Sequence, residues 1–252
     1  MLEVTILAIL QGIAEFLPIS SSGHLVIGQN VLGLGDIGMR LNIFLHLGTL
    51  FSISVFYFST LRAIVSSGDW RYCLKVLLSS VPAVAVYFLF GEFVDSAYSD
   101  VGQVGALLVF TGFVLVGTRF LPQGGKDVDF LRALIMGVGQ ALALLPGVSR
   151  SGMTLAAARA CSVAPEKSAE FSFLMSMPLI AGAAAMEILE SCTGEAVPGA
   201  DVSWPLAVYG CVVSAVVGYF ALKLLVMLLK GKWFWLFGPY CILAGLATLL
   251  CR

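Results

Sequence analysis

Two short polar stretches interrupt an otherwise apolar chain, and both carry residue types that can do chemistry. The first stretch, EFLPISSSGH, spans residues 15–24, and the second, LLPGVSRSGMT, spans residues 144–154. A charged side chain at bilayer depth costs about 2.5 to 3.5 kcal/mol even on a lenient insertion scale. If these stretches lie within a membrane, Glu15 and Arg150 therefore need partners or a function.

The first stretch combines a carboxylate and an imidazole with several hydroxyl groups. Gln11 and Glu15 are four residues apart, so a helix places them on one face. The polar side chains that follow are Ser20, Ser21, Ser22 and His24. Such a set supplies either a nucleophile with its activator or a general acid and base. Glu15 and the side-chain oxygen of Gln11 also predict a site for a hard divalent cation, Mg²⁺ or Ca²⁺.

The second stretch has the residue types that bind an oxyanion. Its polar side chains are Ser149, Arg150, Ser151 and Thr154. Free backbone N–H groups are expected where a helix restarts after Gly147, and a helix N-terminus of this kind favours anions. An arginine among hydroxyls and amides predicts a site for phosphate. Joined to the carboxylate and imidazole of the first stretch, this site is suited to phosphate hydrolysis.

Structural interpretations of the same residues stay open. Serine and glycine near a break in a membrane helix often serve only close packing. Glu15 could neutralise Arg150 as a structural ion pair. His46, which stands in an apolar segment without a motif around it, is more readily explained as an interhelical histidine than as a catalytic one. The catalytic interpretation rests on the convergence of the two stretches.

The composition predicts an all-α integral membrane protein made of one membrane domain, residues 1–252. Hydrophobic residues make up 59% of the 252 residues, charged residues only 12%, and the mean hydropathy is +0.98. The formal net charge is −1, and the sequence has no basic tail or stripe. Both observations argue against a nucleic-acid partner. Membrane lipids are the expected surroundings, and a homo-oligomer is possible.

Uncharged runs predict six transmembrane helices, at residues 41–61, 74–91, 101–119, 171–190, 203–228 and 233–251. Basic and acidic loops alternate along the chain. If the basic loops are cytoplasmic, both termini face outward. The segment 133–163 begins and ends on the basic side, so it is predicted to be a re-entrant hairpin. Residues 1–34 have the same design, with a break at Pro18, and are predicted to form a second one.

The two stretches also align with each other. QGIAEFLPISSSG at residues 11–23 matches QALALLPGVSRSG at residues 140–152 in one glutamine, two serines and the last glycine. Repeat one then covers residues 1–121 and repeat two covers residues 132–252, each with one hairpin and three spans. An odd number of spans inverts the second repeat, and broken helices of inverted repeats meet near the bilayer midplane.

These motifs resemble those of the undecaprenyl pyrophosphate phosphatases of the bacitracin-resistance type. That family carries an (E/Q)xxxE motif followed by Pro-x-Ser-Ser-x-Gly-His, and a PGxSRSxxT motif. Here they correspond to residues 11–15, 18–24 and 146–154. The segments LHLGTL, residues 45–50, and EFSFLMSMP, residues 170–178, are also similar, so the resemblance covers nearly the whole chain.

The resemblance implies an enzyme of the bacterial inner membrane that hydrolyses undecaprenyl pyrophosphate to the monophosphate and recycles this carrier lipid for cell-wall synthesis. It implies a divalent cation and an outward-facing site. The positions that match essential ones in the family are Glu15, Ser21, His24 and Arg150, and phosphate-binding positions are Ser20, Ser22, Gly147, Ser149, Ser151 and Thr154. Gln11 stands where many members have glutamate. This difference argues against chelation of the metal ion by two carboxylates here.

Two questions stay open at this point. The nucleophile is Ser21, His24 or water. The rival function is a transporter or flippase of an anionic lipid phosphate, because inverted repeats with a site at broken helices are also a transporter pattern. A transporter would need the arginine and the amides but no nucleophile beside a base.

Overall fold

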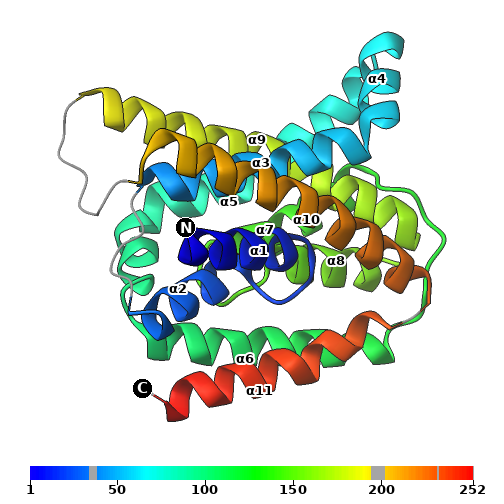
Figure 1. The fold of residues 1–252 in the computed structure, drawn as a ribbon. Coiled ribbons are helices and arrows are strands. Elements are labelled where there is room, and N and C mark those ends of the chain that lie inside the picture. The colour runs from blue at the N-terminus through cyan, green and yellow to red at the C-terminus, as the bar shows by residue number, and fades with distance from the viewer. Residues whose placement is uncertain (34–38, 194–201, 232, 252) are drawn as a thin grey trace.

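The computed structural model describes the chain except for residues 34–38, 194–201, 232 and 252, and Figure 1 shows its arrangement. The described residues form helices and no strand, apart from one isolated bridge between Lys126 and Val163. The predicted all-α class is therefore confirmed. The predicted end of the first hairpin, residue 34, lies outside the described residues.

The first polar stretch forms a break between two helices. Helix α1 spans Leu2–Phe16 and α2 spans Ser21–Val31, so residues 17–20 separate them. Pro18 stands in this break. Ser20 has a left-handed φ of 70°, and its Oγ accepts a hydrogen bond from the N–H of Gly23 at 3.3 Å. The serine therefore caps α2 from a backbone conformation that is uncommon outside glycine.

The second polar stretch forms a matching break. Helix α7 spans Phe130–Leu142 and α8 spans Arg150–Ala160. Gly147, with a φ of +99°, lies between them, and Ser149 caps α8 by accepting from the N–H of Gly152 at 3.1 Å. Both helix–break–helix units are thus present, while their re-entrant placement in a membrane stays a prediction.

Within the part of the chain that the structure describes, four helices are long and apolar enough to cross a membrane. They are α5 (Trp70–Ala97), α6 (Val101–Gly117, extended by the 3₁₀ turn η1, Thr118–Phe120), α9 (Pro165–Thr193) and α10 (Trp204–Lys230). A fifth candidate is a bent pair, α3 (Met39–Phe56) with α4 (Phe58–Ser67). The protein is therefore a multi-pass membrane protein, but the predicted count of six spans is not confirmed.

Two predicted spans differ from the helices found. The run 41–61 was predicted as one helix, yet α3 and α4 meet at an angle of 69° at Tyr57. The sequence around Tyr57 contains neither proline nor glycine, so it has no local signal for this bend. The run 233–251 contains the 3₁₀ turn η2 (Phe234–Leu236) and the short helix α11 (Phe237–Leu250). Fourteen residues of helix rise only about 21 Å, less than the hydrocarbon core of about 30 Å.

The hairpins lie inside the bundle between longer helices, as Figure 1 shows for α1 and α7. Helix α1 packs on α10, α7 packs on α5, and α6 packs along α11. The last pair approaches closely through glycines: a Cβ on Gly112 would lie 2.7 Å from the carbonyl oxygen of Gly238. Small residues at such contacts are typical of membrane helix pairs. The inverted repeat itself stays a prediction.

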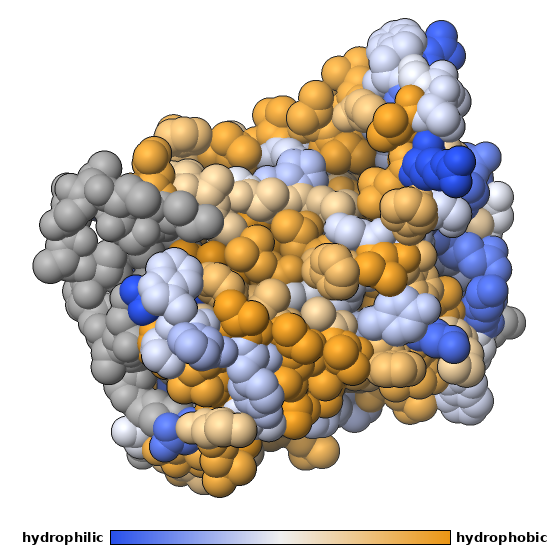
Figure 2. Space-filling model, turned by 45° about the horizontal axis from the view of Figure 1, so that its top comes forward, coloured by the Kyte–Doolittle hydropathy of each residue, from blue (hydrophilic) through white to orange (hydrophobic). Residues whose placement is uncertain are grey.

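The surface of the bundle is mostly apolar. In Figure 2 hydrophobic residues cover most of the visible face, and hydrophilic residues gather toward one edge. Large side chains such as Phe88, Phe113 and Phe220 are 82%, 64% and 62% exposed. Exposed apolar area of this extent is unfavourable in water and favourable against lipid tails. The surface therefore agrees with the membrane assignment.

Candidate active site

The two breaks meet in the interior of the bundle. The Oγ of Ser20 accepts a hydrogen bond from the backbone N–H of Gly147 at 3.1 Å, and Ser151 donates to the carbonyl oxygen of Leu17 at 3.2 Å. A Cβ on Gly23 would lie 3.0 Å from the Cα of Gly147. Stretches far apart in sequence thus form one polar site.

Glu15 and Arg150 form an ion pair at the centre of this site. The Nη2 of Arg150 lies 2.5 Å from the Oε1 of Glu15, and the two side chains are only 16% and 7% exposed. The guanidinium also lies over the ring of Phe173, 5.7 Å from its centroid. Its Nη1 is buried without a hydrogen-bond partner among the described residues. A donor left free in this way is available to an anion.

The second oxygen of Glu15 faces a serine hydroxyl. Ser21 Oγ donates to Glu15 Oε2 at 2.7 Å, and Gln11 Nε2 donates to the same oxygen at 3.2 Å. Ser21 is the first residue of α2 and is half-buried. A hydroxyl aimed at a carboxylate oxygen has the geometry of a nucleophile with its base.

His24 is held by contacts on both ring nitrogens. Its Nδ1 lies 2.9 Å from the carbonyl oxygen of Ser20, and its Nε2 lies 2.8 Å from the hydroxyl oxygen of Tyr240. A carbonyl oxygen only accepts, so Nδ1 donates and Nε2 of the neutral ring is the acceptor. The Tyr240 hydroxyl therefore donates to Nε2, and the two rings stack with centroids 5.7 Å apart.

Tyr240, on α11, lies outside the two polar stretches that the sequence indicates as the site. The structure places Tyr240 beside His24, and the sequence motifs did not predict this contact. A signal was present in the repeat: Tyr240 follows Thr111 at the same separation as Gln140 follows Gln11. Thr111, on α6, contacts the other break, since its Oγ1 donates to the carbonyl oxygen of Gly147 at 2.9 Å and accepts from the N–H of Ser149 at 3.2 Å.

The predicted phosphate-binding residues divide into two groups. Ser149 and Thr154 are engaged in fixing α8, because Ser149 caps the helix and Thr154 bonds to the Arg150 carbonyl oxygen at 2.8 Å and to Ser172 Oγ at 2.6 Å. Ser22 is half-buried and faces Ser20 at 3.4 Å. The amides of Arg150 and Ser151 stand in the first turn of α8, where no intrahelical carbonyl is available. These amides and the Arg150 guanidinium are donors that can bind an anion, and the part of the site that they form is called the anion side below.

The residues around Glu15 fit a divalent cation only with help from a ligand. The Oε1 of Gln11 is buried and has no partner among the described residues, so it is one free oxygen beside the carboxylate. Within the same part of the chain, no group of three His, Cys, Asp or Glu side chains could hold a metal ion. Magnesium commonly binds through one or two carboxylates plus substrate phosphates. The oxygens present match that mode and not an all-protein cage.

His46 was expected to be an interhelical residue. Its Nδ1 lies 3.0 Å from the carbonyl oxygen of Asn42, one turn earlier in α3.

Comparison with known proteins agrees with the geometry. The family model described as "Bacitracin resistance protein BacA" matches residues 4–247. An undecaprenyl-diphosphatase of Desulforapulum autotrophicum is 36% identical over 97% of this chain and 96% of its own length. One from Halothermothrix orenii is 34% identical over 98% and 96%, and one from Methanococcus maripaludis is 36% identical over 99% of both chains. Because the match spans nearly the whole chain, including both breaks, the protein belongs to the bacitracin resistance protein BacA family.

Proposed function

We propose that this membrane protein is an undecaprenyl-diphosphatase, which hydrolyses undecaprenyl diphosphate to undecaprenyl phosphate and inorganic phosphate. This reaction regenerates a carrier lipid for cell-wall synthesis and accounts for bacitracin resistance. Relatives with this name are 34 to 36% identical over almost the full chain. Within the site, the proposal rests on one observation: the Ser21 hydroxyl, 2.7 Å from Glu15, beside an arginine with a free donor.

The anion side of the site binds the diphosphate. Phosphoryl transfer depends mainly on positioning and charge stabilisation. Arg150 Nη1 and the first amides of α8 donate to phosphate oxygens, and the buried surroundings strengthen these contacts. Glu15 keeps the guanidinium in place through Nη2, so the arginine is oriented before substrate arrives.

Ser21 attacks the terminal phosphorus, and Glu15 accepts the proton of its hydroxyl. A bond forms between Ser21 Oγ and phosphorus while the bridging P–O bond breaks, and undecaprenyl phosphate leaves with the electron pair. A water molecule then attacks the phosphoserine and gives its proton to the Tyr240 hydroxyl, which passes its own proton to His24 Nε2, the nitrogen to which it already donates. Phosphate leaves and Ser21 recovers its proton. The alternatives are His24 or water as the direct nucleophile.

A divalent cation, Mg²⁺ or Ca²⁺, is part of the proposal. Glu15 and Gln11 would hold it, with phosphate oxygens completing the coordination. When bound, it would neutralise charge on the diphosphate.

The outward orientation of the site and of both termini is also proposed. Figure 1 places both ends of the chain at one end of the bundle, opposite α4 and the connections from α6 to α7 and from α10 to α11. Basic residues stand at this end of the bundle, among them Arg62 in α4, Lys126 between α6 and α7, and Lys230 at the end of α10. Basic loops face the cytoplasm in most membrane proteins.

The test is phosphate release from undecaprenyl diphosphate by purified protein, with and without EDTA. Release that is abolished by EDTA and restored by Mg²⁺ or Ca²⁺ supports both the activity and the cation. Release unaffected by EDTA removes the cation from the proposal. No release under any metal condition, together with anionic-lipid translocation in liposomes, supports the transporter instead.

The nucleophile is tested with substrate labelled in its terminal phosphate. A labelled protein adduct should form in the wild type and in His24→Ala, and should be absent in Ser21→Ala. An adduct that survives Ser21→Ala but not His24→Ala assigns the attack to His24. An adduct that survives both changes excludes both residues.

A further inference from the structure

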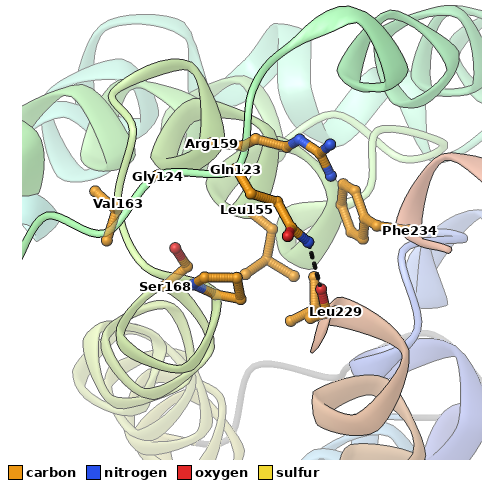
Figure 3. A pocket seen from close by; sticks show the side chains of 9 residues that line it. Gln123, Gly124, Leu155, Arg159, Val163, Ser168, Leu229 and Phe234 are labelled. Carbon is orange, nitrogen blue, oxygen red and sulfur yellow. Dashed lines mark hydrogen bonds between the residues drawn. The ribbon is translucent and has the colours of Figure 1, made fainter. Parts of the chain in front are cut away.

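A second polar cavity lies away from the active site. It has a volume of about 240 Å³ and is formed by the start of α5, the loop before α7 and the start of α9. The residues that matter in its wall are Tyr72, Lys75, Asp127, Lys167, Glu170 and Phe171. A separate cavity near Gln123 and Arg159, drawn in Figure 3, holds only about 20 Å³, roughly one water molecule. A hydrogen bond from Gln123 to the carbonyl oxygen of Leu229 joins two of the residues that line it.

The wall of the larger cavity carries two charges of each sign. Lys75 and Lys167 supply the positive charges, and Asp127 and Glu170 supply the negative ones. Lys75 Nζ uses one donor on the carbonyl oxygen of Val128 at 2.9 Å. Lys167 Nζ is 3.8 Å from Glu170 Oε1, a loose contact that leaves its donors available. A ligand that is neutral but carries both a cation and an anion matches this wall.

The hydroxyl of Tyr72 is buried and has no hydrogen-bond partner among the described residues. The ring cannot easily turn to find one, since it packs edge-on against Phe171 with centroids 5.8 Å apart and lies under Lys75 Nζ at 5.2 Å. A buried hydroxyl without a partner is unfavourable, and an acceptor from a ligand in the cavity would satisfy it.

The position of the cavity suits a lipid headgroup. It lies at the starts of α5 and α9, two of the candidate membrane spans. Leu74 and Leu77, beside Lys75 on α5, are 45% and 58% exposed and begin an apolar surface along that helix. A lipid whose headgroup is held in the cavity would therefore place its acyl chains against α5.

We propose that this cavity binds the headgroup of a zwitterionic phospholipid with a phosphodiester and a primary amine. The phosphate accepts from Lys167, Lys75 and the Tyr72 hydroxyl, and the ammonium donates to Asp127 and Glu170. A free phosphate ion would accept from the same lysines. It has no cationic group, however, to pair with the two carboxylates. The proposal stands independently of the phosphatase activity.

The test uses the full-length protein, purified in detergent and freed of lipid, with native mass spectrometry as readout. Short-chain phosphatidylethanolamine, phosphatidylcholine and phosphatidylglycerol are titrated in turn. One ethanolamine lipid should bind in preference to the others, because choline has no N–H to donate and glycerol carries no cation. Lys167→Gln should weaken this binding roughly tenfold, as loss of a charge-assisted hydrogen bond does. Tyr72→Phe, which keeps the ring, should weaken it roughly threefold.

Lys223→Gln is the matched control, since this exposed lysine lies on α10 outside the cavity and loses the same charge. It should bind as the wild type does. Unchanged melting temperatures for all three variants show that they fold. Equal binding of all three lipids, or equal loss in Lys223→Gln, overturns the proposal. Displacement of the bound lipid by millimolar inorganic phosphate would also overturn it, because the cavity would then be a simple anion site.

Discussion

At the residue scale, Glu15 is the point where the chemistry of the two breaks joins. One oxygen accepts from Arg150, 135 residues away in the chain, and the other accepts from Ser21 and Gln11. The ion pair agrees with a structural role as well as with a catalytic one. The difference is that a structural pair needs no hydroxyl aimed at the carboxylate, whereas Ser21 is placed there at 2.7 Å.

Replacing Arg150 with lysine should reduce kcat/KM for undecaprenyl diphosphate by about 100-fold, the usual effect of losing one transition-state donor. A lysine ammonium is a point charge and cannot bond to Glu15 and the phosphate with two separate nitrogens as the guanidinium does. Phosphate release measures the effect. Arg159→Lys is the control, because among the described residues Arg159 donates to the carbonyl oxygen of Leu121, away from the site. Near-normal turnover of Arg150→Lys would show that Arg150 does not act as this donor to the phosphate.

Replacing Tyr240 with phenylalanine should lower kcat by roughly three- to tenfold and leave KM nearly unchanged, as loss of one hydrogen bond to His24 predicts. The stacked ring is retained, so only the hydroxyl contact to His24 Nε2 is lost. Tyr209→Phe is the matched control, since that hydroxyl bonds to Thr5 Oγ1, not to a site residue. An equal effect of the two variants, or a change confined to KM, contradicts the assignment.

At the element scale, the helix breaks are held by neighbours as much as by their own sequence. Thr111 on α6 bonds to both sides of the Gly147 break, and Tyr240 on α11 bonds to His24 just after the first break. Helices α6 and α11 pack along each other. One pair of helices therefore positions residues from both hairpins.

Gly147→Ala should abolish most activity and lower the melting temperature. Residue 147 has a φ of +99°, and an added Cβ would lie 2.5 Å from the carbonyl oxygen of Val104 on α6. Either α6 or the break must move, and the Ser20 and Thr111 contacts move with it. Gly117→Ala, at the end of α6, has open space around its Cβ and a helical backbone, so it should be neutral or slightly stabilising. Thermal unfolding in detergent and phosphate release check both variants.

At the scale of the whole molecule, the fold places its polar site inside an apolar shell. Buried charges and irregular backbone are tolerated in a membrane only inside protein or beside a wet cavity. The breaks satisfy this condition because α5, α6, α9 and α10 surround them. Charge at the two ends of the bundle then decides its orientation.

The proposed orientation places the C-terminus outside the cytoplasm. A C-terminal fusion to a fluorescent protein that matures only in the cytoplasm should be dark in bacterial cells, while a fusion to a periplasmic phosphatase should be active. Both fusions should retain phosphate release in detergent, which shows that the membrane domain has folded. Bright fluorescence with an inactive periplasmic reporter would reverse the orientation of the site.

The sequence by itself determined the class of the protein and predicted the chemistry of its site. Composition and uncharged runs establish an apolar helical bundle because lipid requires every backbone group to be satisfied within the segment. The motifs around Glu15 and Arg150 indicate the helix breaks and an oxyanion ligand because capping, proline and glycine act locally. None of these inferences needs a contact between distant residues.

Only the tertiary structure decided how the parts meet. It placed Ser21 and Arg150 on opposite oxygens of Glu15, brought Tyr240 to His24, and engaged Thr154 with Ser172. It also bent α3 away from α4 at Tyr57, where the local sequence contains no breaker. The physical reason is common to all of these features. Each depends on packing between helices far apart in the chain, and local residue preferences do not encode which side chains will share a space.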